Sequence, residues 1–146
     1  MKEKTFRILR DDRPLEDKVK EGYIYVDPHI TSENFRAALP AGRNAGEATL
    51  VNFGEYVFSE DVVNRLDKLS LRPGLPTELA DLSKSHPGST EFAGCVPLVA
   101  LGDSWVGPLG NLLVVYLVGD ASGRELSLHW RGSGWMDTYW FIAFHK

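Results

Sequence analysis

The sequence predicts an α+β fold in which two helices pack on an antiparallel sheet. Two observations support this class: apolar residues recur at helical spacing in residues 59–69 and 77–85, and from residue 96 onward the spacing becomes that of strands. The chain has 146 residues, of which 43% are hydrophobic and 25% are charged. That length and balance fit one globular domain, residues 1–146, with its own core.

The N-terminal part, residues 1–22, is crowded with charges of both signs. Within it, residues 5–9 form a weak strand candidate. We expect the polar residues 11–21 to be a loop or a frayed helix. A short run rich in β-formers follows at residues 23–26 and is stopped by an Asp-Pro pair.

The next stretch alternates between helix and strand signals. Thr31 or Ser32 is a good N-cap for a short helix that ends at residue 39, before a proline. Residues 41–46 are rich in turn formers, and residues 48–53 are predicted to form a strand.

The clearest helix spans residues 59–69, because Ser59 is a good N-cap and two acidic residues follow it in the first turn. A second helix, capped by Thr77, runs to residue 85 and is stopped by Pro-Gly. Seven residues of these helices and of the following sheet are predicted to be core: Leu66, Leu69, Leu79, Leu82, Leu117, Leu128 and Phe141.

The C-terminal region, residues 96–146, contains four strand candidates joined by glycine-rich connections. They span residues 96–101, 112–118, 126–130 and 139–144. Such short connections predict an antiparallel meander. In the third strand Leu126, Leu128 and Trp130 share one face. The alternate residues Glu125, Ser127 and His129 are therefore predicted to line its solvent face.

Composition argues against several classes of partner and site. The net charge is −4, and no Lys/Arg run offers the basic face needed to bind nucleic acid or anionic lipid. The N-terminus lacks the apolar region of a signal peptide, and the longest apolar run, residues 112–118, is too short to cross a membrane, so we expect a cytoplasmic protein. Cys95 is the only cysteine and the four histidines lack ligand spacing, so we expect neither a metal nor another cofactor.

Two residues have the chemistry of a nucleophile. Ser104 follows a strand in a Gly-Asp-Ser sequence, as in lipases and esterases of the GDSL type, but neither His129 nor His145 has the aspartate three residues earlier that those enzymes use. Cys95 could pair with a histidine, although a lone cysteine entering a strand is more often a small buried residue. Neither residue predicts a complete active site.

Aromatic residues are concentrated near the C-terminus. Trp135, Tyr139 and Trp140 lie next to a Gly-Ser-Gly loop. Rigid aromatic side chains beside small polar residues are typical of a recognition surface, although part of this group must pack in the core.

Several segments resemble known proteins. Residues 71–79 (LRPGLPTEL), followed by the aromatic sheet that ends in FIAFHK, resemble bacterial C-type-lectin-like domains, including the formylglycine-generating type. More closely, the chain resembles a family of short bacterial proteins that is similar to the variable proteins of diversity-generating retroelements. The segments that carry this second resemblance are VDPHIT (26–31), GEY (54–56), SEDV (59–62), VALG (99–102) and RELSLHW (124–130).

The resemblance implies a C-type-lectin-like scaffold with a C-terminal surface that can be diversified for ligand binding. The implied ligand-binding residues are Glu125, Ser127, His129, Arg131, Ser133, Trp135, Met136, Asp137, Thr138 and Tyr139. The chain lacks the paired cysteines and the Glu-Pro-Asn or Gln-Pro-Asp motif of extracellular lectins, so calcium-dependent sugar binding is not expected.

These observations favour a non-catalytic protein that binds an unknown ligand, which we expect to be a protein. We expect Trp135 to lie at or near the centre of the binding surface. Two alternatives remain open: a small hydrolase that uses Ser104 or Cys95, and an inhibitor or immunity-type interaction protein.

Overall fold

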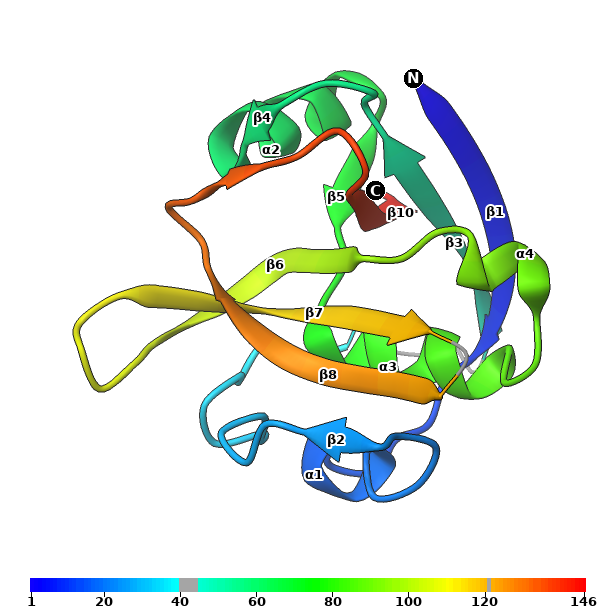
Figure 1. Ribbon diagram of the computed structural model, residues 1–146, viewed down its shortest axis with the longest axis vertical. Coiled ribbons are helices and arrows are strands. Elements are labelled where there is room, and N and C mark those ends of the chain that lie inside the picture. Colours follow the sequence, from blue (N-terminus) through cyan, green and yellow to red (C-terminus); the bar gives the residue numbers. More distant parts are fainter. Residues whose placement is uncertain (40–44, 121) are drawn as a thin grey trace.

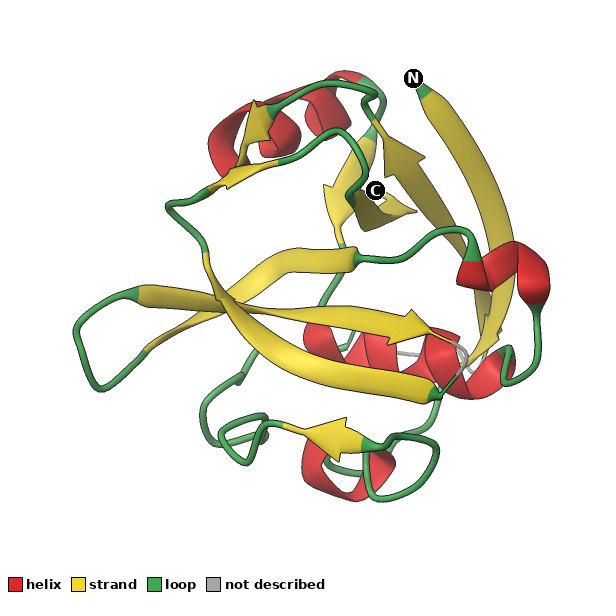
Figure 2. Cartoon of the chain, viewed as in Figure 1, coloured by secondary structure: helices red, strands yellow, loops and turns green. Residues whose placement is uncertain are grey.

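The computed structural model describes residues 1–39, 45–120 and 122–146. These residues form four helices and ten strands, most of them in one mixed sheet with the order β1-β3-β10-β6-β7-β8-β2. The fold is therefore α+β and dominated by its sheet (Figure 1, Figure 2).

The N-terminal half contributes one end of the sheet. Strand β1 (Lys2–Leu9) pairs along its whole length with β3 (Ala45–Asn52) in antiparallel register. The weak strand predicted at residues 5–9 thus begins three residues earlier, because pairing with β3 extends it. One helical turn, α1 (Leu15–Lys18), and the two-residue strand β2 (Tyr25–Val26) follow.

The helix predicted at residues 31–39 is wrong. Residues 32–34 form a turn, and residues 35–39 have no regular structure. The Thr31 side chain accepts a hydrogen bond from the Asn34 backbone N–H at 3.3 Å, and Phe35 N–H donates to the Thr31 carbonyl at 2.9 Å. Thr31 therefore makes the hydrogen bonds of an N-cap, but they stabilise a single turn and no helix follows it. Most of the turn predicted at 41–46 lies outside the described residues.

Both predicted helices are present, and they cover opposite faces of the sheet. Helix α2 (Ser59–Lys68) buries Val62 and Leu66 in one core, and helix α3 (Pro76–Ser85) buries Leu79 and Leu82 in the other. Neighbouring strand residues divide between the two cores in the same way, since Leu50 packs with α3 and Val51 with α2. One predicted core residue is wrong: Leu69 is 40% exposed, because α2 ends at Lys68 and the chain turns there.

Short elements connect and extend these layers. Strand β4 (Val57–Phe58) precedes α2, and strand β5 (Leu71–Pro73) leads from α2 to α3. A single turn, α4 (Thr90–Ala93), precedes β6; its N-cap Ser89 accepts a hydrogen bond from Phe92 N–H at 3.1 Å.

The predicted meander is correct for three strands and wrong for the fourth. Strands β6 (Leu98–Val106), β7 (Leu112–Asp120) and β8 (Gly123–Trp130) are antiparallel neighbours. After β9 (Gly134–Trp135), the chain crosses the sheet, and β10 (Trp140–His145) enters between β3 and β6, parallel to β6. The side chains of β10 are apolar on both faces, which suits a central strand better than an edge.

Candidate functional site

The alternation predicted for β8 is present where its side chains meet the core. Leu126 is buried and Leu128 packs partly against the core under α3. The register places Ser127 opposite Tyr116 and His129 opposite Val114, on the other face of the sheet. Glu125, Ser127 and His129 therefore share a face, although each of them is half-buried rather than fully exposed.

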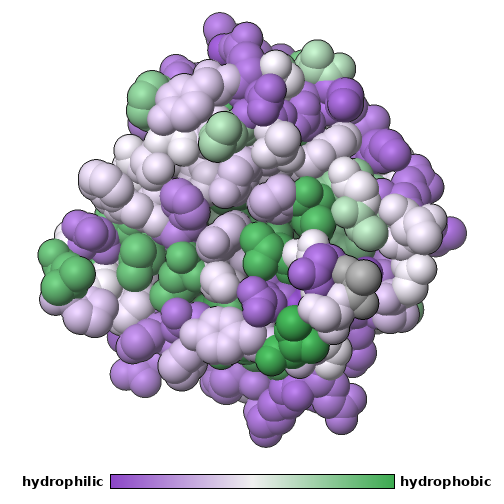
Figure 3. All heavy atoms as spheres, in the orientation of Figure 1, coloured by the Kyte–Doolittle hydropathy of each residue, from purple (hydrophilic) through white to green (hydrophobic). Residues whose placement is uncertain are grey.

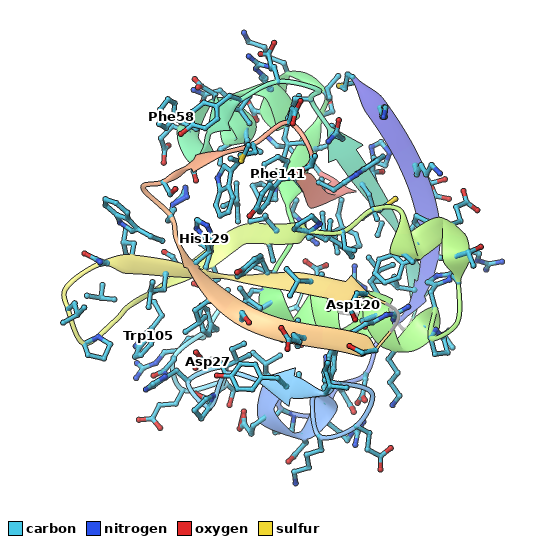
Figure 4. The ribbon with its side chains drawn as sticks, viewed as in Figure 1. Asp27, Phe58, Trp105, Asp120, His129 and Phe141 are labelled. Carbon is cyan, nitrogen blue, oxygen red and sulfur yellow. The ribbon has the colours of Figure 1, made fainter. Side chains whose placement is uncertain are left out.

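Four ring systems meet on this face and form what is here called the aromatic cluster: Tyr116, His129, Trp135 and Tyr139. The His129 ring lies 4.4 Å from that of Trp135 and 5.3 Å from that of Tyr116, measured between centroids, and Trp135 lies 5.4 Å from Tyr139. Figure 4 shows His129 on β8 and Phe141 on the central strand β10. The cluster thus joins β7 and β8 to the chain that crosses back to the sheet centre.

Trp135 is not at the surface, contrary to the prediction. It is fully buried, and its indole N–H donates a hydrogen bond of 2.9 Å to Ser59 Oγ. Pairing of β9 with β4, in which Trp135 lies opposite Val57, turns the indole toward α2. Trp135 is therefore the buried member of the aromatic cluster.

Arg131 and Ser133 lie in the turn after β8 and have structural contacts. The Arg131 carbonyl accepts a hydrogen bond of 2.6 Å from Ser59 Oγ, and its guanidinium lies 3.1 Å from a Glu60 carboxylate oxygen. Ser133 N–H donates to the Trp130 carbonyl, and its hydroxyl donates to the Gly134 carbonyl. These contacts hold the turn against α2 and place both residues at the margin of the aromatic cluster.

Three further predicted residues, Met136, Asp137 and Thr138, are exposed on the loop between β9 and β10. Asn52, which is 4% exposed, anchors this loop. Its side-chain amide donates to the carbonyls of Asp137 at 2.7 Å and Tyr139 at 2.9 Å. The loop is therefore held at a fixed position beside the aromatic cluster.

Sequence reasoning did not identify Asn52 or Tyr116 as part of this region. Asn52 ends a strand about 85 residues before the loop it anchors, and no local signal links the two. Tyr116 lies in the longest apolar run, residues 112–118, where no local signal indicates an open face. Its cross-strand pairing with Ser127 places it on the half-open face instead.

The aromatic cluster also has a distinct electrostatic character. Partial burial raises the pKa of the Tyr116 hydroxyl, and the neighbouring Tyr139 and Glu125 raise it further. Tyr116 therefore stays protonated at neutral pH and can both donate and accept a hydrogen bond. Figure 3 shows residues of intermediate hydropathy, with several hydrophobic residues among them, across the middle of the molecule in this view, and strongly hydrophilic residues mainly along the top, right and lower edges.

The two nucleophile candidates lie in different settings. Cys95 is fully buried, burial raises its thiol pKa, and its Sγ contacts the Glu91 carbonyl at 3.6 Å. Ser104 lies in the irregular part of β6, where its backbone N–H donates to its neighbour Asp103. Among the residues that the structure describes, no histidine forms a hydrogen bond with either side chain.

One His–Asp pair was missed by the sequence. His29 Nδ1 lies 3.0 Å from Asp27 Oδ1, and the His29 ring stacks on Trp105 with 5.0 Å between centroids. Figure 4 places both labelled residues, Asp27 and Trp105, below β8 in its view. The pair orients His29 at the surface next to Trp105 of β6.

A hollow of about 890 Å³ lies away from the aromatic cluster. It is bounded by α1, the end of α3 and the β7–β8 hairpin, and its lining mixes both charge signs. Its less exposed cations already have protein partners: Lys18 Nζ lies 3.2 Å from the Asp81 carboxylate, and Arg124 donates to the Ser83 and His86 carbonyls. The hollow is therefore the space at the junction of α1, α3 and the β7–β8 hairpin, and its less exposed cations are bound by the protein itself.

The described part of the chain contains no group of three or more His, Cys, Asp or Glu side chains arranged to hold a metal ion. Within the same residues, no helix has both the length and the apolar character needed to cross a membrane. Comparisons with protein-family models, with curated proteins and with solved structures found no match.

Proposed function

We propose that this protein binds a partner protein, without catalysis, through the half-open face that carries the aromatic cluster. The observation that carries the proposal is the placement of Tyr116, His129 and Tyr139 over a fully buried tryptophan. Rigid aromatic side chains lose little conformational entropy on binding and supply large contact areas, so they dominate the energetics of many interfaces.

The surroundings of the aromatic cluster support this role. Ser127 and Glu125 add polar groups on the same strand face, and the loop with Met136, Asp137 and Thr138 adds exposed side chains at its margin. An apolar centre bordered by polar groups matches the usual anatomy of a protein interface. From the predicted set, only Trp135 leaves the proposed contact surface, because it is buried.

The finer assignment remains part of the proposal. The C-type-lectin-like scaffold and a C-terminal surface open to diversification rest on the sequence resemblance alone, whereas a cytoplasmic location and the absence of a nucleic-acid or membrane partner rest on composition and charge. If the partner proves to be an enzyme, the protein acts as an inhibitor or immunity-type protein through the same face.

The test compares two variants in affinity capture from the native host. Ser127→Arg places a bulky charge on the proposed face, and Thr5→Arg makes the same kind of change on exposed β1. We expect a partner retained by the wild-type protein and by Thr5→Arg to be lost at least tenfold with Ser127→Arg. Equal retention by all three proteins would remove the basis for this face.

A direct assay tests the hydrolase alternative. We expect the purified protein not to hydrolyse p-nitrophenyl acetate above the rate of a folded Ser104→Ala, Cys95→Ala control. A higher wild-type rate that is lost in either single variant would overturn the non-catalytic proposal.

A further inference from the structure

Strand β8 is paired along only part of its outer edge. On that side it meets β2, which pairs with Glu125 and Leu126. The last hydrogen bond of this pairing runs from Asp27 N–H to the Leu126 carbonyl at 3.0 Å. Beyond it, none of the described strands lies beside residues 127–130 on this outer side.

The sequence explains why β2 stops there. The Asp27 carboxylate accepts a hydrogen bond of 2.9 Å from the His29 backbone N–H, and the Asp27 carbonyl accepts one of 3.0 Å from Ile30. Pro28, between these residues, has no N–H to offer to a sheet. The chain therefore turns away from β8 after Asp27.

The backbone groups left at this edge can be identified from the register. The carbonyls of Arg124 and Leu126 accept from β2 and its flanks, whereas Arg131 N–H donates to Leu112 on the β7 side. Because backbone groups alternate along a strand, the N–H and carbonyl of Leu128 and the N–H of Trp130 point outward. Such a row of open donors and acceptors is a template for another strand.

The side chains beside this edge are not of the kinds that block the addition of another strand. Residues 127–130 contain no Lys, Arg, Asp, Glu or Pro, the residues that usually block strand addition. Trp130 is 53% exposed, and Leu128 is partly buried on the same strand face, so both offer apolar contact. Ser127 and His129 flank the edge on the face of the aromatic cluster.

We propose that an extended segment of the partner polypeptide adds to β8 along residues 127–130, in line with β2. The inference rests on the proposed function and specifies its partner as a strand with an apolar side chain facing Leu128 and Trp130. Backbone hydrogen bonds provide affinity in this binding mode, and alternate side chains provide specificity.

The available length favours a short segment over a second copy of this chain. Four residues are free between the Asp27 turn and the turn that begins at Arg131. In antiparallel pairing between two copies of β8, the outward backbone groups match when Leu128 of one copy lies opposite Trp130 of the other, and Gly132 of each copy then lies opposite Leu126. That site is already occupied by the end of β2.

The experiment separates the backbone donor from the side chain. Trp130→Ala removes the indole but keeps the N–H, whereas Trp130→Pro removes both. Because this N–H faces away from β7, proline is compatible with the β7–β8 pairing, and we expect the two variants to melt within a few degrees of each other. The probe is a set of heptapeptides selected on the wild-type protein from a displayed random library.

We expect the selected peptides to show alternating apolar residues and to bind Trp130→Pro at least tenfold more weakly than Trp130→Ala. Equal binding to the two variants, or no enriched peptide, would overturn strand addition. Peptides that discriminate between these variants but bind Ser127→Arg normally would support strand addition and count against the proposed face. A wild-type dimer that only Trp130→Pro dissociates would assign the edge to a second copy and overturn the partner segment.

Discussion

β1 and β8 lie toward opposite ends of the large sheet, and their outer edges are finished differently. Exposed Lys2, Glu3, Lys4 and Arg7 lie along β1. The end of β1 is also tied to α3, since Leu9 N–H donates to Ser85 Oγ and the Arg7 carbonyl contacts His86 Nε2 at 2.6 Å. Over residues 127–130, β8 has no charged residue, and on its outer edge none of the described strands lies beside it.

The side-chain contacts near the two ends of the sheet differ in the same way as their edges. Near β1, the fully buried Glu78 carboxylate bridges Arg10 at 2.7 Å and Arg72 at 2.8 Å. Both guanidinium groups also lie about 5 Å from the Phe144 ring, at 5.1 and 5.0 Å. Near β8 the corresponding contacts are between aromatic rings, most of which are half-buried. The comparison shows that one end of the sheet is closed by charged and hydrogen-bonded side chains, whereas the other keeps an open strand edge beside half-buried aromatic rings.

The largest effect is expected at the closed end. Glu78→Gln leaves Arg10, whose side chain is 7% exposed, without its counter-charge. Removing one partner of a buried ion pair costs about 3–5 kcal/mol. Urea denaturation measures the loss, with Glu55→Gln as control because its ion pair with Arg65 is exposed and is worth less than about 1 kcal/mol. Equal costs for the two variants would show that the closed end is not held by this cluster.

Trp135→Phe tests whether the buried indole beneath the half-open face contributes to the stability of the fold. The change removes the hydrogen bond to Ser59 Oγ and part of the buried volume, so we expect a loss of about 1–3 kcal/mol in the free energy of unfolding. Met136→Ala, at an exposed neighbouring position, is the control and should change stability by less than about 0.5 kcal/mol. If the Trp135→Phe protein were as stable as the wild type but no longer bound the partner that the wild type retains, Trp135 would belong to the contact surface.

Asp81, which contacts Lys18 at the α1–α3 junction, is expected to make the stability of the protein depend on pH. Burial raises the pKa of Asp81 from 3.8 to about 6, so between these values the folded state binds a proton that the unfolded state does not. Stability from this group therefore falls as pH rises from about 4 to 6. We expect the stability difference between wild type and Asp81→Asn to shift in favour of the wild type as pH falls from 7 to 4.5. Parallel pH profiles of the two proteins would contradict this.

The smallest effect is expected on the open face. Combined Ser127→Ala, Asp137→Asn and Thr138→Ala substitutions remove side chains for which the structure shows no buried polar contact, so each should cost less than about 0.5 kcal/mol. Leu128→Ala, on the other face of the same strand, should cost about 2 kcal/mol or more through cavity formation. Thermal melts compare them. A triple variant as unstable as Leu128→Ala would mean that the face is part of the core.

Local patterns in the sequence were sufficient to place several elements. The apolar spacing of α2 and α3 identified both helices, and the alternation of β8 correctly separated Leu126 from Ser127 and His129. These patterns work because side-chain direction follows from backbone geometry within a few residues. Strands β6, β7, β8 and β10 were identified for the same reason, whereas the two-residue strand β9 was not predicted.

The tertiary structure alone decided what those faces meet. The apolar run of β10 indicated a strand, yet only long-range packing placed it between β3 and β6, parallel to β6. Trp135 reads as a surface aromatic beside a glycine loop, but pairing with Val57 far earlier in the chain buries it. Periodicity determines which side chains share a face. The element that covers the face is set by contacts between residues distant in sequence, and these have no local signature.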